Sequence, residues 1–80
     1  MPCYLLYHHH EPRECGVVFA AFKGYESSLR HQMTLASCGS GGHAIWWRVD
    51  AESEQAALAL LPFYVAERTK AAQVNDVEIP

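Results

Sequence analysis

The chain has 80 residues, of which 50% are hydrophobic and 19% are charged, and its formal net charge is −3 at pH 7. This composition excludes a disordered chain, because it supplies enough apolar surface to build a core, and the length fits one domain spanning residues 1–80. The six basic residues are scattered without an interleaved aromatic ladder, which argues against a nucleic acid partner.

No stretch of the sequence is long and apolar enough to span a bilayer; one of the longest covers only residues 56–61. The N-terminal segment lacks the basic start and the small-residue cleavage site of a signal peptide. We therefore expect a cytoplasmic protein with no membrane partner. The three cysteines match no zinc ribbon or knuckle spacing, and reduced thiols are expected.

Residues 3–10 predict a first strand, which ends at Glu11 and Pro12. Apolar residues then recur with helical spacing and predict a helix over residues 13–23, with Gly24 suited to its C-terminal cap. Cys15 belongs to the apolar stripe of this helix, so we expect it to pack as a small hydrophobic residue in the core.

The second half of the chain predicts a hairpin, a helix and a last strand. Residues 33–38 and 43–49 are strand-like and flank the glycine-rich turn 39–42. A run of good helix formers over 56–61 follows Asp50 and Ser53, either of which can cap it, and Pro62 interrupts it. Residues 73–79 predict the closing strand.

The resulting order predicts an α+β fold of the ferredoxin-like βαββαβ type, an antiparallel sheet with two helices on one face. The other face would be bare, and we expect Trp46 to line it together with Tyr4 and Leu6. A bare apolar face in a small protein commonly meets another subunit, so we expect a homodimer with two-fold symmetry.

The glycine-rich hairpin into Ala44-Ile45-Trp46-Trp47, the Leu60-Leu61-Pro62 helix and the closing Val77-Glu78-Ile79-Pro80 segment are similar to those of small bacterial proteins of the dimeric α/β-barrel superfamily. The resemblance covers nearly the whole chain by pattern and includes no catalytic motif. It implies ferredoxin-like subunits paired through their sheets. Its members include small monooxygenases, muconolactone-isomerase-like enzymes and nickel-binding relatives, so it implies no single function.

Three consecutive histidines, His8 to His10, give the strongest chemical signal. Side chains alternate along a strand, so His8 and His10 share one face. We expect the strands 3–10 and 43–49 to be neighbours and parallel. This arrangement predicts a first cluster at one end of the sheet and a second, weaker cluster at the other. The first contains His8, His10, Glu11, Cys15 and His31, and the second contains Cys3, Cys38 and His43.

The first cluster predicts a binding site for a divalent transition metal, because imidazole and carboxylate groups suit zinc, nickel and copper. The expected ligands are His8 and His10 with a neighbour such as Glu11 or His31. The same residues are also compatible with a solvated polar strand end whose imidazoles bond to carbonyl groups or to Glu11.

Two other functions stay open. The chain could be a small enzyme that uses a sheet-face pocket at Trp46 and Arg48, suited to a small anionic or aromatic molecule. Its base would be a histidine or Pro2, which becomes a secondary amine if Met1 is removed, as in the tautomerase superfamily. The chain could also be a structural or interaction domain without a site.

Overall fold

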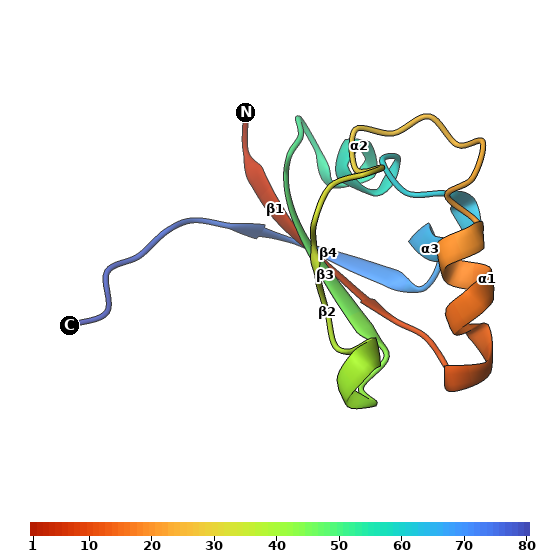
Figure 1. Ribbon diagram of the computed structural model, residues 1–80. Helices are drawn as coiled ribbons and strands as arrows, with labels where there is room; N and C mark the ends of the chain where they lie inside the picture. Colours follow the sequence, from red (N-terminus) through yellow and green to blue (C-terminus); the bar gives the residue numbers. More distant parts are fainter.

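The computed structural model describes residues 1–80 and has a four-stranded antiparallel sheet with short helices on one face (Figure 1). The strands are β1 (Cys3–His9), β2 (Leu35–Ala36), β3 (Ala44–Asp50) and β4 (Thr69–Val74), in the order β2-β3-β1-β4. The helices are α1 (Cys15–Ala20), α2 (Glu54–Leu58) and α3 (Phe63–Ala66), with 3₁₀ turns η1 (Pro12–Glu14) and η2 (Cys38–Ser40). The predicted α+β class and antiparallel sheet are confirmed.

Alternation along the two central strands builds the core. Tyr4 and Leu6 of β1 lie opposite Val49 and Trp47 of β3, and all four side chains are buried on the face that the helices cover. The helices contribute buried residues to the same cluster, including Val18 from α1. The apolar side chains of this face therefore hold the helices against the sheet.

The predicted orientation of Tyr4 and Leu6 is wrong. The register pairs Tyr7 with Trp46, so these two rings share the open face, with centroids 5.7 Å apart, and Tyr4 and Leu6 point toward the helices. A shift of one residue in the assumed register exchanges the two faces of a strand. Trp46 does lie on the open face, as expected, and it is half-buried there.

The strands β1 and β3 are neighbours, as predicted, but they run antiparallel. The helical crossover through α1 returns the chain in its original direction, so β1 and β2 both run antiparallel to β3. The start of β3 therefore lies beside the end of β1, where His9 pairs with Ala44. The predicted parallel direction is wrong, and this changes which residues meet at that end of the sheet.

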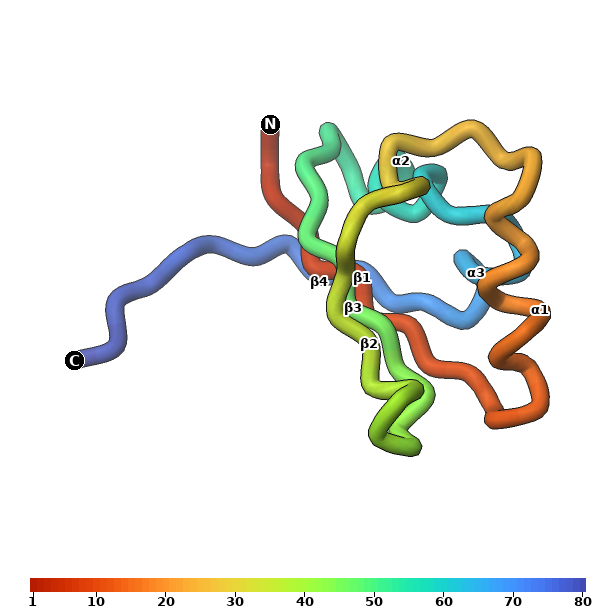
Figure 2. Tube along the Cα trace, viewed as in Figure 1, coloured from red at the N-terminus to blue at the C-terminus, as the bar shows by residue number.

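The closing strand lies earlier than predicted. Instead of residues 73–79, β4 covers Thr69–Val74, and Val74 pairs with Cys3 at the first residue of β1. The pairing of β4 with β1 ends there, and residues 75–80 extend away from the sheet as a tail (Figure 2). Val77 and Ile79 are exposed on this tail instead of packing in the sheet.

The predicted helix starts and ends are confirmed only in part, since α1 covers Cys15–Ala20 instead of residues 13–23. The Ser53 hydroxyl accepts a hydrogen bond from the Ala56 N–H at 3.0 Å and caps α2. Gly24 takes a left-handed conformation, with φ of 79°, but it is not the cap of α1, because that helix ends at Ala20 and Ala21 is its C-cap. Pro62 separates α2 from α3. None of these helices has the length and apolar composition required to cross a membrane.

Candidate metal centre

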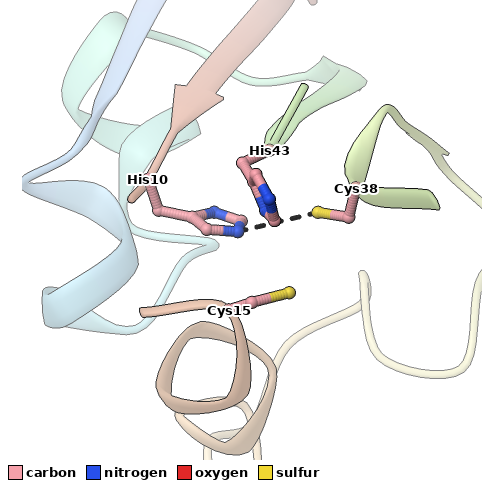
Figure 3. Close-up of side chains that lie close together, drawn as sticks. All are labelled: His10, Cys15, Cys38 and His43. Carbon is pink, nitrogen blue, oxygen red and sulfur yellow. Dashed lines mark hydrogen bonds between the residues drawn. The ribbon is translucent and has the colours of Figure 1, made fainter. Parts of the chain in front are cut away.

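Four side chains from four separate segments converge where β1 ends and β3 begins (Figure 3). They are His10, Cys15, Cys38 and His43, and one ligand atom from each lies within 4.8 Å of those of the others. His10 is buried and the other three are partly buried. The group offers two imidazole nitrogens and two sulfurs and could hold a metal ion.

The antiparallel pairing of β1 and β3 brings the two histidines together. The His10 N–H donates to the His43 carbonyl at 3.1 Å and extends the strand ladder by one residue. The two imidazole rings lie 5.5 Å apart between centroids, in an edge-on arrangement. His43 has a φ of 51°, a left-handed backbone conformation that costs a non-glycine residue about 1–3 kcal/mol.

The glycine-rich turn places Cys38 opposite His10. Ser37 and Ala44 exchange backbone and side-chain hydrogen bonds, which close the hairpin just before η2. Gly41 takes a φ of 85°, and a Cβ atom at Gly42 would overlap the Ser37 hydroxyl. The turn is thus compact, and the Cys38 sulfur lies 3.6 Å from Nε2 of His10.

A polar clamp fixes the segment that carries Cys15. The Glu14 carboxylate accepts hydrogen bonds from the Glu11 N–H at 2.9 Å, the Tyr64 hydroxyl at 2.8 Å and the Arg68 guanidinium at 3.0 Å. The first two of these bonds and then the charge of Arg68 lower the pKa of Glu14 to about 2. The clamp joins the start of α1 to the region of α3, and Cys15 follows it directly.

His8 orients the ring of His10 through a chain of hydrogen bonds. The Thr69 hydroxyl donates to the Val65 carbonyl at 2.7 Å, so its oxygen can accept from Nδ1–H of His8 at 3.0 Å. The Val65 carbonyl, 3.3 Å from the same Nδ1, can only accept. Nε2 of neutral His8 is then an acceptor, and Nδ1–H of His10 donates to it at 3.0 Å.

This assignment leaves the lone pair of His10 on Nε2, which points at the group of four. Neutral imidazole is the form that binds metals, and a partner on the other nitrogen fixes the tautomer. Burial and the neighbouring histidine charges lower the pKa values of both His8 and His10, which favours the neutral form. His8 thus acts on the site through His10.

Two other features of the group match metal binding. Nδ1 of His43 is buried and has no hydrogen-bond partner, an arrangement that costs about 1–3 kcal/mol. Burial, followed by the adjacent Cys15 thiol, raises the pKa of Cys38, so the metal-free site holds a neutral thiol. A bound cation would remove that proton and stabilise the thiolate.

The residues predicted as ligands lie in different parts of the structure. His10 belongs to the group of four, and His8 is hydrogen-bonded to the His10 nitrogen that faces away from the group. Glu11 is exposed and contributes its backbone N–H to the Glu14 clamp. His31 is exposed in the segment before β2, at the other end of that strand. Neither Glu11 nor His31 belongs to the group that the structure brings together.

The predicted separation into two clusters is wrong for Cys38 and His43, because it depended on parallel β1 and β3. With β1 and β2 running in the same direction, the end of β2 lies near His10 and carries Cys38 there. The antiparallel β3 brings His43 to the same place. Cys3 remains at the far end of β1, opposite Asp50.

Cys15, predicted to pack in the core although it was also expected near the first cluster, is only partly buried and faces the other ligands. It begins α1, three residues after Pro12, and its place beside His10 agrees with the first cluster and not with the predicted core role. The predicted pocket residues lie elsewhere. Trp46 is half-buried and Arg48 is exposed on the open sheet face, and neither lines a pocket of the structure.

Comparisons of the chain with family models, with curated proteins and with solved structures gave no match.

Proposed function

We propose that this protein binds a divalent transition metal ion through His10, Cys15, Cys38 and His43, and that the ion is zinc. The observation that carries the proposal is the convergence of four donor atoms from four segments within 4.8 Å. Two sulfurs with two imidazoles form the donor set of many structural zinc sites, and zinc takes it in tetrahedral geometry. Nickel and copper, which prefer square-planar or tetragonal sites as divalent ions, suit the set less well.

The spacing supports closure around an ion with small movements. Zinc–sulfur bonds of about 2.3 Å and zinc–nitrogen bonds of about 2.0–2.1 Å place tetrahedral ligand atoms roughly 3.3–3.8 Å apart. The donor atoms lie within 4.8 Å of one another, so the largest separation must shorten by about 1 Å. Cys38 lies in a surface turn and Cys15 at a helix start, where rotation of a side chain can supply this movement.

Four protein ligands favour a structural or storage role for the ion. Catalytic zinc sites keep one position open for water or substrate, whereas this group supplies a full tetrahedron. The ion would tie together the end of β1, the start of α1, the turn η2 and the start of β3. Such a link compensates for the small core of a domain of this size.

The finer fold assignment belongs to the same proposal. The chain order of strands and helices, with β1 and β3 in the centre of the sheet, supports a ferredoxin-like arrangement. The enzymatic alternative at Trp46 and Arg48 predicts turnover that survives a chelator, whereas the metal proposal predicts no such activity at these residues.

The test is native mass spectrometry of untagged protein, purified without chelators and then supplied with one equivalent of zinc. We expect one zinc ion per chain, retained by a Cys3→Ala control and lost in a Cys15→Ala/Cys38→Ala variant. Alkylation should agree, because zinc would protect Cys15 and Cys38 and leave Cys3 reactive. Unchanged stoichiometry in the double variant would overturn the proposed ligands.

A further inference from the structure

A second site lies beside α1, where a pocket of about 260 Å³ opens between this helix, the segment before β2 and β3. Its apolar walls are Phe19, Phe22, Leu29 and Trp47. Trp47 is almost fully buried, and its ring lies 6.1 Å from that of Phe22 between centroids. The interior can therefore accept an aromatic or branched aliphatic group.

The rim of this pocket is basic. Lys23, Arg30 and His31 line it, and no acidic residue does. The ion pairs of the structure involve only Arg48 and Arg68 among the basic residues, so Lys23 and Arg30 have no carboxylate partner. Glu26 lies in an adjoining hollow with Arg30 but forms no ion pair with it. Unpaired cations beside an apolar pocket complement an anionic group.

Hydrogen bonds hold the rim in place although residues 25–34 form no regular element. The Tyr25 hydroxyl donates to the Ala59 carbonyl and the Ser27 hydroxyl to the Leu60 carbonyl, both at 2.6 Å. At the other end, the Thr34 hydroxyl donates to the backbone of Trp46 at 2.6 Å. A rim anchored at both ends loses less conformational entropy when a ligand binds.

From these observations, we propose that the pocket binds a small carboxylate with an apolar body. The apolar body would lie against Phe22, Leu29 and Trp47, and the carboxylate would meet Lys23 and Arg30. The volume is slightly below the roughly 300–1,000 Å³ of most ligand pockets, which limits the ligand to a small molecule. Phe19 lines this pocket and also meets the ring of His10 edge-on, with centroids 6.5 Å apart, so the two sites are neighbours.

The experiment uses a Trp46→Phe variant, in which Trp47 is the only tryptophan and reports on the pocket by fluorescence. The probes are 3-phenylpropionate and the matched neutral alcohol 3-phenylpropanol, titrated with zinc present and with a chelator. We expect a saturable change with the acid and a dissociation constant about tenfold higher for the alcohol. Substitutions Lys23→Gln and Arg30→Gln should each weaken binding of the acid about two- to fivefold and leave the alcohol unaffected.

A Lys70→Gln variant is the matched control, because Lys70 is exposed on β4 and does not line the pocket. It should bind the acid as tightly as the parent. Equal affinity for acid and alcohol, equal loss in the control, or no saturable response would each overturn the proposal. Binding that persists with the chelator supports this pocket even if the metal proposal fails.

Discussion

The three consecutive histidines occupy two different environments. His8 and His10 are buried, with 0% and 2% of their surface exposed, and they are hydrogen-bonded to each other. His9 lies between them on the open face of the sheet and is exposed. The difference arises from strand alternation, since residue type and sequence neighbourhood are almost the same. His9 is therefore a natural control for any role assigned to His8 or His10.

The largest expected difference between the buried histidine His10 and the exposed histidine His9 is in how much zinc raises the Tm of their alanine variants. Zinc at about 1,000 times its dissociation constant stabilises the folded chain by about 4 kcal/mol, which for a domain of this size raises Tm by about 15–30 °C. We expect this rise in Tm in the wild type and in His9→Ala. Thermal unfolding with zinc and with a chelator measures it. His10→Ala should show almost none of it. An equal rise in Tm with zinc in His9→Ala and His10→Ala would show that His10 is not a ligand.

A smaller effect is expected for His8, because it acts only through His10. His8→Phe keeps a ring in the core but removes the acceptor for Nδ1–H of His10. Loss of such a partner lowers metal affinity by about 10–100-fold, measured by competition with a chromophoric chelator. His9→Phe should leave affinity unchanged. If His8→Phe binds zinc like the wild type, the hydrogen-bond chain has no role in positioning His10.

The Glu14 clamp gives a pH-dependent prediction. The folded pKa of about 2 lies below the usual 4.5, so the carboxylate stabilises the fold fully above pH 4.5 and less as the pH falls toward 2. Glu14→Gln should therefore lose stability mainly above pH 4.5 and show a shallower decline of Tm below it. The comparison uses chelator throughout, so that metal release does not contribute. Parallel profiles for both proteins would contradict the clamp.

The open face bears on the predicted homodimer, which stays a prediction. The rings of Trp46 and Tyr7 lie side by side there in a tilted arrangement, and Leu35 is 74% exposed beside them. A Trp46→Glu substitution should convert a dimer into a monomer in sedimentation analysis, with little effect on zinc affinity because Trp46 faces away from the site. Sedimentation of the wild-type chain as a monomer would contradict the predicted homodimer.

Much of the fold follows from local patterns. Strand alternation, the glycine-rich turn and the Ser53 cap predict the order of elements, because each depends on neighbouring residues. The last strand could not be placed in the same way. Its limits depend on where β1 begins, and the alternation of Val77 and Ile79 suggests pairing that the sheet does not offer.

The site depends on a single non-local fact, the direction of β3 relative to β1. Because β1 and β2 are parallel, the end of β2 that carries Cys38 lies near His10. The hairpin from β2 to β3 then brings His43 to the same place. The sequence places His10 and Cys15 in one cluster, because a histidine triplet is conspicuous and Cys15 follows the end of its strand closely. It assigns Cys38 and His43 to the other end of the sheet, because their position depends on the direction of β3. Isolated cysteines with irregular spacing also resemble ordinary core residues.

The most direct test of the metal centre is X-ray absorption at the zinc edge on the zinc-loaded chain. The account predicts a four-coordinate ion with two sulfur neighbours at about 2.3 Å and two imidazole nitrogens at about 2.0–2.1 Å. A first shell that contains only nitrogen and oxygen would contradict it, because Cys15 and Cys38 would then not be ligands.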